Sequence, residues 1–269
     1  MPEANSSNGG VRTPWQVARS VWFAMFMRET ISRTMADRFA WFWMIFEPVA
    51  FVGIFIAIRT MIRGDRFVIG ADFIPWLIVG LMGFFLFREG MNRPVGAIEA
   101  NQGLFAYRQV LPIDPVLVRI VLEGLLRTFI FLIFIVGGIM LGLDLYADLP
   151  MFAMWAWLSL WALGAGAGLT ISAAAALVPE IGRVVKMISL PLMLISGVII
   201  PMSLKSYHLQ QLMLYNPIAH AIEFLRLGFF ENYKTVSGIS MLYVWMFALA
   251  LIALGMILHL RFAEELKAK

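Results

Sequence analysis

Residues 151–178 read MFAMWAWLSLWALGAGAGLTISAAAALV and contain neither a charged side chain nor a proline. A helix of about 20 apolar residues is long enough to cross the hydrocarbon core of a bilayer. Outward from this stretch, five further apolar segments recur along the chain, at 39–58, 73–91, 116–142, 188–204 and 239–259. The sequence therefore predicts an all-α integral membrane protein with six transmembrane helices.

The composition agrees with a membrane protein. Of the 269 residues, 61% are hydrophobic and 14% are charged, whereas a soluble domain carries about 25% charged residues. The chain has no cysteine, which excludes disulfides, zinc fingers and cysteine nucleophiles. The basic residues lie between the apolar segments, a pattern of membrane topology rather than of nucleic-acid binding.

Recognisable catalytic motifs are missing from the sequence. None of the five lysines follows a glycine, so there is no Walker A motif, and neither H-E-x-x-H nor G-x-S-x-G occurs. The longest polar stretch between spans, 88–115, is shorter than a soluble domain. We therefore expect a transporter or channel subunit rather than an enzyme, with no cofactor or metal of its own. If transport consumes ATP, a separate chain must supply the ATPase.

The N-terminal segment precedes the first apolar run. Residues 1–13 are small and polar, and we expect them to be disordered. Thr13 and Gln16 have the spacing of a capping box. Over 14–36, tryptophans recur at helical spacing beside arginines, which predicts an amphipathic helix in the membrane interface. The alternative is an ordinary soluble amphipathic helix.

The distribution of lysine and arginine predicts the orientation of the spans. With the N-terminus inside, thirteen basic residues fall in cytoplasmic segments and six in outer segments. Both termini are therefore expected in the cytoplasm. Arg59, Arg63 and Arg66, in the first outer loop, run against this rule.

A seventh apolar stretch, before the last span, is too polar on one side to face lipid. His220, Glu223 and Arg226 recur every three residues, and two prolines interrupt the preceding span. Broken helices at membrane depth are tolerated where protein buries them or where they line a cavity. Residues 204–230 are therefore predicted to form a re-entrant helical hairpin before the last span.

Charged residues inside the spans are the sharpest functional signal. Arg119, Glu123 and Arg127 step by four residues and share one helical face, where Glu123 can pair with either arginine. Two interpretations stay open: a charged strip on a translocation path, or a structural role in tying helices together and reaching headgroups. Glu47, which precedes Pro48 in the first span, is expected to find a donor on a neighbouring helix.

Aromatic residues crowd the start of the first span, among them Trp41, Trp43 and Phe46. The simpler interpretation is an interfacial aromatic belt. The sharper interpretation is a stacking surface, because flat aromatic faces pack against the C–H faces of sugar rings and let a polysaccharide slide.

Small residues mark two places of close helix packing. Gly164 with Gly168, and Gly138 with Gly142, form G-x-x-x-G motifs. Such motifs permit close contact of helices, either within one chain or across a dimer.

Several segments together resemble a known family. They are the amphipathic N-terminal helix, the Glu47-Pro48 pair, the stretch from Asn101-Gln102-Gly103-Leu104 to Val110-Leu111-Pro112, and Ser196-Gly197-Val198-Ile199-Ile200-Pro201 followed by Tyr215-Asn216-Pro217-Ile218 and Ile222-Glu223-Phe224-Leu225-Arg226. From about Trp15 to the C-terminus, the chain resembles the membrane subunit of an ABC-2-type exporter, specifically the capsular-polysaccharide-export permeases of Gram-negative bacteria (Kps/Bex type). The aspartate usual in this family after the fourth span is absent, and Pro179-Glu180 stands near that position.

The resemblance implies an assembly in the bacterial inner membrane. This chain would form a homodimer bound to two copies of a separate ABC ATPase, and that ATPase would bind ATP and Mg²⁺. Residues 14–269 would form the ABC-2 transmembrane domain, and the cytoplasmic stretch 93–108 would dock into the ATPase. The contact candidates are Glu99, Asn101, Gln102 and Phe105, and the candidates in the outer hairpin are Tyr215, Asn216, Pro217, His220, Glu223 and Arg226.

The resemblance also implies a cargo, an acidic polysaccharide carried on a lipid and moved from cytoplasm to periplasm. A periplasmic co-polymerase-type adaptor and an outer-membrane exporter would receive it. Its negative charge fits the arginines of the charged strip. The candidates for the translocation path are Glu47, Arg119, Glu123, Arg127, Trp41, Trp43 and Phe46.

Three alternatives stay open. The same fold serves export of O-antigen or teichoic acid and efflux of small molecules. An ion-coupled secondary transporter usually has matched broken helices in its two halves, whereas this chain has one broken region. A membrane enzyme acting on lipid-linked sugars would need paired acidic residues, for which Asp144 and Asp148 are the candidates.

Overall fold

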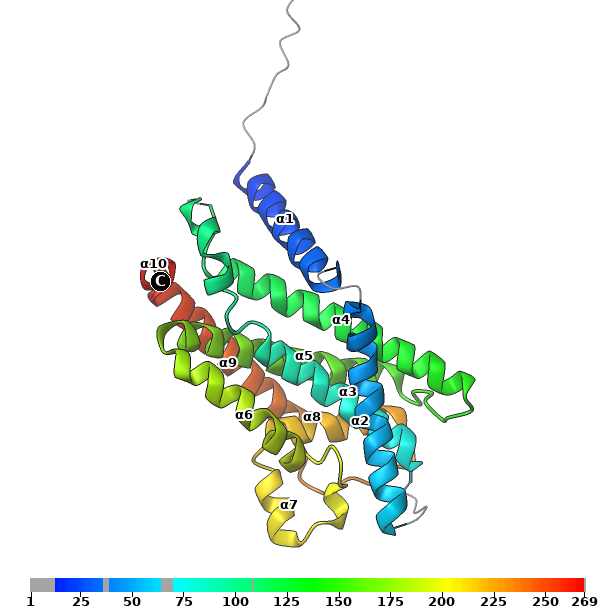
Figure 1. The fold of residues 1–269 in the computed structure, drawn as a ribbon. Coiled ribbons are helices and arrows are strands. Elements are labelled where there is room, and N and C mark those ends of the chain that lie inside the picture. Colours follow the sequence, from blue (N-terminus) through cyan, green and yellow to red (C-terminus); the bar gives the residue numbers. More distant parts are fainter. Residues whose placement is uncertain (1–12, 36–38, 64–69, 108, 269) are drawn as a thin grey trace, which may run out of the picture.

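The computed structural model describes residues 13–35, 39–63, 70–107 and 109–268, and it is built from helices. In chain order these are α1 (Pro14–Met35), α2 (Ala40–Arg63), α3 (Phe73–Asn92), the 3-10 helix η1 (Glu99–Ala106), α4 (Ile113–Met140), α5 (Pro150–Leu177), α6 (Pro179–Ile195), the short 3-10 helix η2 (Met202–Leu204), α7 (Tyr207–Met213), α8 (Pro217–Phe229), α9 (Met241–Arg261) and α10 (Ala263–Ala268). Figure 1 shows their arrangement.

Among the described residues, four helices are long and apolar enough to cross a membrane: α3, α4, α5 and α9. They correspond to four of the six predicted spans. The first predicted span is the apolar stretch Phe42–Ile58 inside α2, which is shorter. The second, α3, continues past Arg88 and Glu89 to Asn92, as its short apolar length required.

The fifth predicted span, 188–204, has the wrong boundaries. Proline at the first helical position restarts the helix at Pro179, so the predicted loop 179–187 is the first half of α6. The helix ends at Ile195, and Gly197 follows with a φ of 71°. Because that backbone conformation favours glycine, the chain turns there instead of continuing as a helix to residue 204.

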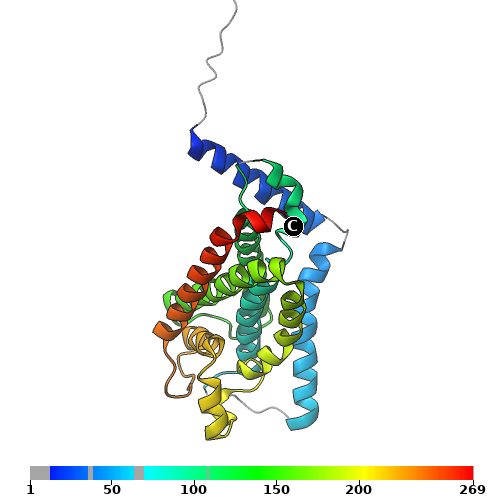
Figure 2. The same cartoon turned by 90° about the vertical axis from the view of Figure 1, so that its left-hand side faces the viewer.

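The helix α5 lies at the centre of the bundle (Figure 2), and glycines let its neighbours approach. A Cβ on Gly164 would lie 2.7 Å from the backbone oxygen of Phe87 in α3. On another face of α5, a Cβ on Gly166 would lie 2.9 Å from the oxygen of Ala248 in α9. The Gly164–Gly168 motif is therefore used for packing within one chain. The second motif is not a helix-packing pair, because α4 ends at Met140 and Gly142 lies in the following turn at a φ of 79°.

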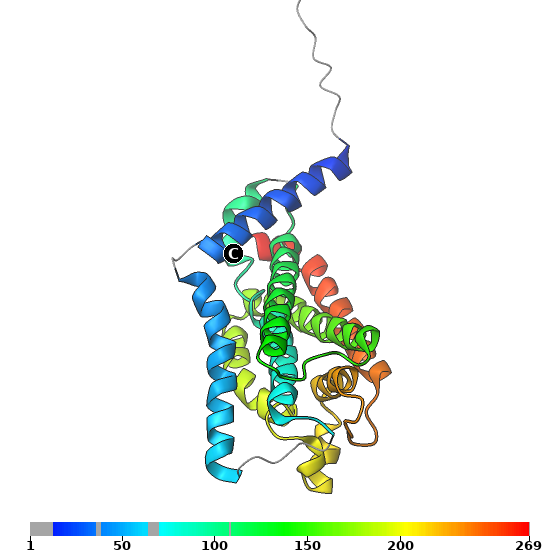
Figure 3. The same ribbon diagram turned by 90° about the vertical axis from the view of Figure 1, so that its right-hand side faces the viewer.

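One end of the bundle carries α1, η1 and α10, whereas α7 lies at the opposite end (Figures 1 and 3). The predicted capping box starts α1: the Thr13 amide donates to Gln16 Oε1 at 3.0 Å, and the Gln16 amide donates to Thr13 Oγ1 at 3.4 Å. The helix then packs on α4, where Trp22 Nε1 donates to Asp114 at 3.1 Å. Of the predicted disordered N-terminus, residues 1–12 lie outside the described part of the chain.

Candidate functional site

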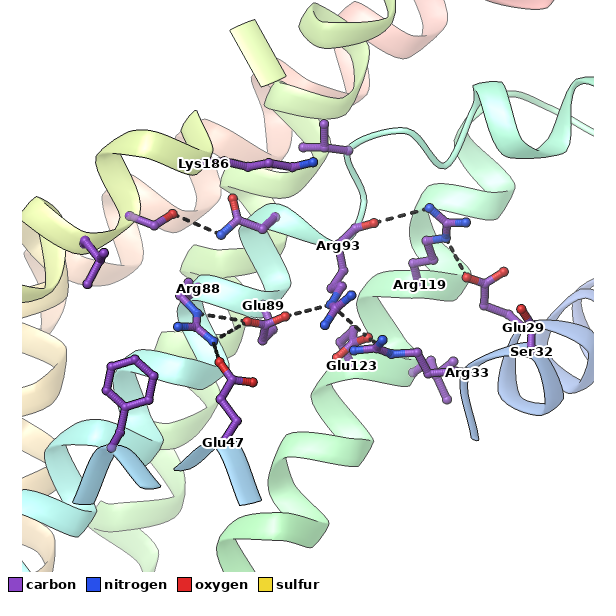
Figure 4. A pocket seen from close by; sticks show the side chains of 16 residues that line it. Glu29, Ser32, Arg33, Glu47, Arg88, Glu89, Arg93, Arg119, Glu123 and Lys186 are labelled. Carbon is purple, nitrogen blue, oxygen red and sulfur yellow. Dashed lines mark hydrogen bonds and ion pairs between the residues drawn. The ribbon is translucent and has the colours of Figure 1, made fainter. Parts of the chain in front are cut away.

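A cavity of about 700 Å³ lies between α1, α2, α3, α4 and α6, toward the end that carries α1 (Figure 4). Charged side chains dominate its wall. The lining residues are Glu29, Ser32, Arg33, Glu47, Phe51, Arg88, Glu89, Asn92, Arg93, Val95, Arg119, Leu122, Glu123, Lys186, Ser189 and Leu190. Four carboxylates and five cations from five helices therefore face one space.

Ion pairs along α3 join α2 to the cavity wall. Arg88 binds Glu47 of α2 at 2.6 Å and its neighbour Glu89 at 2.8 Å. Glu89 also binds Arg93, one helical turn further, at 2.7 Å. The expectation that Glu47 finds a donor on a neighbouring helix is thus confirmed. The pairing holds α2 to α3 at a point where Pro48 interrupts the backbone hydrogen bonding of α2.

The same series of ion pairs continues into α4 and α1. Glu123 lies 2.9 Å from Arg33 of α1 and 3.7 Å from Arg93. Arg119, one turn before it on α4, binds Glu29 of α1 at 2.6 Å. A continuous row of alternating charges therefore runs from α2 through α3 to α4 and α1, as Figure 4 shows.

Arg127 lies deeper, where its side chain is 4% exposed, 3.7 Å from Glu89 and 4.0 Å from Glu47. The three charged residues of α4 thus face the same side of the helix, but their ion-pair partners differ from the predicted ones. Glu123 pairs with arginines of α1 and the segment after α3 instead of Arg119 or Arg127. Neighbouring helices supply closer, better oriented groups than the next turn of the same helix does.

The cavity wall also contains charged residues that were not predicted as site residues from the sequence. Glu29, Arg33, Arg88, Glu89 and Arg93 all form its ion pairs. The sequence does carry one signal for them, because Glu89 and Arg93 have the i,i+4 spacing of a helical ion pair. Lys186, which entered only the orientation count, extends into the same space from α6 (Figure 4).

The cavity can bind molecules that carry both charges and hydroxyl groups. Each arginine that lines it already has a carboxylate partner in the chain. A bound anion would therefore compete with the internal carboxylates. Each ion pair that it formed with an arginine would replace an ion pair within the chain. The carboxylates themselves accept hydrogen bonds from hydroxyl groups. Such a wall can bind a polar ligand weakly, so that the ligand can dissociate from one set of contacts and form the next.

The aromatic candidates lie on α2 and are not among the residues that line this cavity. Trp43 and Phe46 are 58% and 42% exposed, and their rings meet edge to face with centroids 5.6 Å apart. Trp41 and the arginines Arg59 and Arg63 lie in α2, but their side chains fall outside the described part, as does the whole of Arg66. An exposed aromatic face on α2 fits both the belt and the stacking interpretation.

A second polar cluster occupies the other end of the bundle. Glu223 and Arg226 of α8 are fully buried and pair at 2.8 Å. Arg226 also donates to the backbone oxygens of Gly197 and Val198, each at 2.9 Å, and its guanidinium lies 3.5 Å from the centre of the Trp76 ring. The predicted polar stripe therefore faces protein, and it holds the turn after α6 against α8 and α3.

Tyr233 and Thr235 complete the surroundings of Glu223. Their hydroxyls donate to Glu223 Oε2 at 2.8 and 2.6 Å. Burial raises the pKa of the Tyr233 phenol above its ordinary value, so it stays protonated and remains a donor. The buried carboxylate thus has a cation and two hydroxyl donors, which is the condition for burying a charge at tolerable cost.

The other residues of the predicted hairpin have structural partners. Asn216 caps α8 through the Ile218 amide at 3.0 Å and donates to Ser196 at 2.9 Å, and Pro217 takes the first helical position. His220 accepts from the Ser240 amide at 2.9 Å. Tyr215 is 75% exposed.

The coupling candidates lie on η1 and differ in exposure. Glu99 and Gln102 are exposed and Phe105 is half-buried. Asn101 is buried and accepts a hydrogen bond from Arg28 of α1. It therefore holds η1 on α1, a role that leaves its side chain no free surface for a partner.

A model of the ABC-2 type transporter family matches residues 20–230. The chain belongs to this family. It is 32% identical over 256 residues to the polysialic acid transport protein KpsM of Escherichia coli, covering 94% of this chain and 97% of the relative. It is 26% identical over 242 residues to the capsule polysaccharide export inner-membrane protein CtrC of Neisseria meningitidis, covering 90% of each. It is 28% identical over 238 residues to the corresponding protein BexB of Haemophilus influenzae, covering 87% of this chain and 88% of the relative.

Membership of the ABC-2 family fits the four candidate spanning helices. The chain is thus a multi-pass membrane protein and a permease-type transport subunit. The cavity, η1 and the buried cluster on α8 all lie within the matched residues of the ABC-2 family, whereas α9 and α10 follow them.

Proposed function

We propose that this chain is the permease subunit of an ATP-driven exporter that moves lipid-linked acidic capsular polysaccharide from cytoplasm to periplasm. The observation that carries the proposal is the charge-lined cavity among helices apolar enough to span a membrane. Ionisable residues at membrane depth are costly to bury, so their presence there is a sign of function. Similarity over almost the whole chain to proteins named for capsule export supports the choice of cargo.

The arrangement in the membrane is part of the proposal. We assign six crossings to α2, α3, α4, α5, α6 and α9, with α7 and α8 as a re-entrant hairpin at the periplasmic side. The excess of lysine and arginine favours cytoplasmic termini in the inner membrane. In this orientation α1 lies in the cytoplasmic interface, where its exposed Trp15 and Phe23, at 77% and 65%, face headgroups and acyl chains.

A homodimer would close the cavity. In a single chain the cavity opens between helices instead of being sealed inside them, and a wall of charges cannot face hydrocarbon. A second copy would cover the opening and form a continuous path. Because Gly164 and Gly168 already pack against α3, the dimer contact falls on other helices.

The energy source would be a separate ATPase that binds ATP and Mg²⁺, two copies per dimer. We propose that it docks at the end with α1 and η1, where Glu99 and Gln102 are exposed. Periplasmic and outer-membrane partners, an adaptor and an exporter, would receive the polymer at the α7 end. In this assignment Asn101 positions η1 instead of touching the ATPase.

The chemistry of the cavity fits an acidic glycan. Carboxylates of the polymer can exchange with Glu89, Glu123 and Glu29 as partners of the arginines, and sugar hydroxyls can donate to the same carboxylates. Because each new contact replaces an internal ion pair, binding stays weak enough for movement. The exposed rings of Trp43 and Phe46 on α2 offer a surface for stacking.

Deletion of the gene tests the proposal. We expect lipid-linked acidic polysaccharide to accumulate in the cytoplasm with an otherwise intact envelope, and a plasmid copy to restore export. Accumulation of O-antigen or teichoic acid instead would show that the exported polymer is one of these and not capsular polysaccharide. A normal surface polysaccharide in the deletion strain, with altered drug sensitivity or ion-dependent uptake, would overturn polysaccharide export.

A further inference from the structure

The last described helix, α10, contacts α5 and α9 and shares a buried cluster with the segment that leads into η1. Leu266 is its residue in this cluster, with no exposed surface. It shares a buried cluster with Ala97 and Ile98, which are 0% and 3% exposed and lie directly before η1. Phe105 of η1 packs against the same cluster. One side chain of this six-residue helix is thus buried as deeply as the core.

The opposite side of η1 is held by α1. Asn101 accepts from Arg28, and Leu104 and Phe105 pack with Met25 of α1. The segment before and within η1 is therefore clamped from two sides, by the first helix and by the last. Figure 2 shows α1, η1 and α10 together at one end of the molecule.

The two sides of the clamp lead to different parts of the bundle. On one side, α1 is tied to α4 through the ion pair of Glu29 with Arg119 at 2.6 Å. On the other, α10 continues from α9, with the Leu266 amide donating to the oxygen of Phe262 at 2.9 Å. Because α9 and α10 both contact α5, α10 links this end of the molecule to the centre of the bundle.

The outer surfaces of η1 and α10 carry exposed carboxylates, one of which, Glu264, pairs with Lys267 of α10 at 2.9 Å. Glu99 on η1 and Glu264 and Glu265 on α10 are all exposed. Both elements lie at the same end of the molecule (Figure 2), and the exposed carboxylates of Glu99 and Glu265 favour basic side chains on a docking protein.

We propose that α10 is part of the surface on which the ATPase subunit docks, with Leu266 as the residue that positions α10 against the coupling segment. The inference rests on the proposed function, because that function supplies the ATPase as occupant. It adds a contact outside the residues that the family model matches. Leu266 itself touches no partner and acts through Ala97 and Ile98.

The first experiment uses cysteine protection, which this cysteine-free chain makes specific. Single variants Gln102→Cys on η1, Glu265→Cys on α10 and His208→Cys on α7 are each purified with and without the co-expressed ATPase. Their reaction with a bulky maleimide is then timed. We expect the ATPase to slow labelling at 102 and at 265 at least about fivefold, the lower end of usual coupling between sites, and to leave 208 unchanged.

The outcomes separate the two proposals. Protection at 102 without protection at 265 overturns the role of α10 and leaves the proposed function standing. Protection at neither position overturns docking at this end, and with it this part of the proposed function. Because these variants change exposed residues, the result does not depend on a destabilised chain.

The second experiment tests Leu266 as a positioning residue. Leu266→Ala is compared with Leu266→Met, which keeps the volume, and with Leu260→Ala, which shortens a leucine that is 65% exposed. We expect Leu266→Ala alone to lower both ATPase retained per permease and polysaccharide exported per ATP hydrolysed, with Leu266→Met restoring both. Wild-type values for Leu266→Ala in both measurements would overturn the positioning role.

Discussion

The guanidinium of Arg33 lies 2.9 Å from the carboxylate of Glu123. Arg33 belongs to the last turn of α1, whereas Glu123 is a 4% exposed side chain inside α4. A buried carboxylate in the cavity wall therefore depends on a cation from the helix that lies across the end of the bundle. Movement of α1 changes the charge balance of the cavity directly.

Removal of that cation is expected to cost stability. In Arg33→Gln, Glu123 loses its nearest cation and keeps Arg93, at 3.7 Å, so we expect a loss of stability below the roughly 3–5 kcal/mol that a fully unpartnered buried charge costs. The control is Arg183→Gln, since Arg183 and Glu180 form an exposed pair at 3.7 Å and such pairs contribute at most about 1 kcal/mol. Thermal melts of both variants in detergent check the prediction. Equal melting temperatures would contradict it.

The charge of Glu123 is expected to matter for transport as well as for assembly. Glu123→Ala removes the partner of Arg33, so Arg33 becomes free to hold an anionic polymer, whereas Arg93 keeps Glu89 at 2.7 Å. We expect reduced export, measured as surface polysaccharide in a deletion strain that carries the variant. Asp144→Ala, at an exposed loop position, serves as control. Normal expression with normal export in Glu123→Ala would remove the charged strip from the mechanism.

The close approach of α3 and α5 predicts a sharp difference between two glycines. A Cβ on Gly168 would collide with the backbone oxygen of Gly90, whereas a Cβ on Gly137 of α4 would meet nothing within 4 Å. Gly168→Ala is therefore expected to destabilise by about 1–3 kcal/mol through overpacking. Gly137→Ala is expected to be neutral or stabilising by up to about 1 kcal/mol. The melting temperatures of the two purified variants test this difference. A lower melting temperature for Gly137→Ala than for Gly168→Ala would contradict the close packing of α3 on α5.

The aromatic face of α2 allows a test between a belt and a stacking surface. Trp43 is 58% exposed, on the same helix as the cavity residue Glu47. If its ring stacks on sugar, Trp43→Phe keeps a flat face and most of the export, whereas Trp43→Leu keeps only the hydrophobicity and loses export. We expect this order in pulse-labelled polysaccharide release at equal protein levels. Equal export by both variants would favour the belt.

Much of the fold follows from periodicity and composition, and the differences have physical causes. Long, mostly apolar stretches predicted α3, α4, α5 and α9, because a bilayer demands length and apolarity. The fifth span was misplaced because Glu180, Arg183 and Lys186 resemble a loop in sequence. Proline at the first helical position instead makes them the first turns of α6.

Only those features of the site that depend on a single helix could be predicted from the sequence. The spacing of Arg119, Glu123 and Arg127 correctly placed them on one face, yet their partners come from α1, α2 and α3. Which helix faces that strip depends on the packing of the bundle, and no local pattern encodes it. The stripe on α8 was predicted better, because a helix that polar on one side has to turn that side toward protein.

The buried pair on α8 gives the last prediction. In Arg226→Met, Glu223 loses its cation and the oxygens of Gly197 and Val198 lose their donors. We expect destabilisation of about 3–5 kcal/mol. The change Glu223→Gln made in the Arg226→Met background is expected to recover part of this loss, because a neutral amide can keep the hydroxyl partners Tyr233 and Thr235.

A double-mutant cycle measures this coupling. The melting temperatures of wild type, Arg226→Met, Glu223→Gln and the double variant should give an interaction of about 1–3 kcal/mol, as usual for residues in one network. Lys234→Met, which removes an exposed cation nearby in sequence, controls for loss of charge and should change little. Strictly additive effects would mean that Arg226 holds the turn after α6 without help from Glu223, and that the carboxylate is retained for its hydroxyl partners alone.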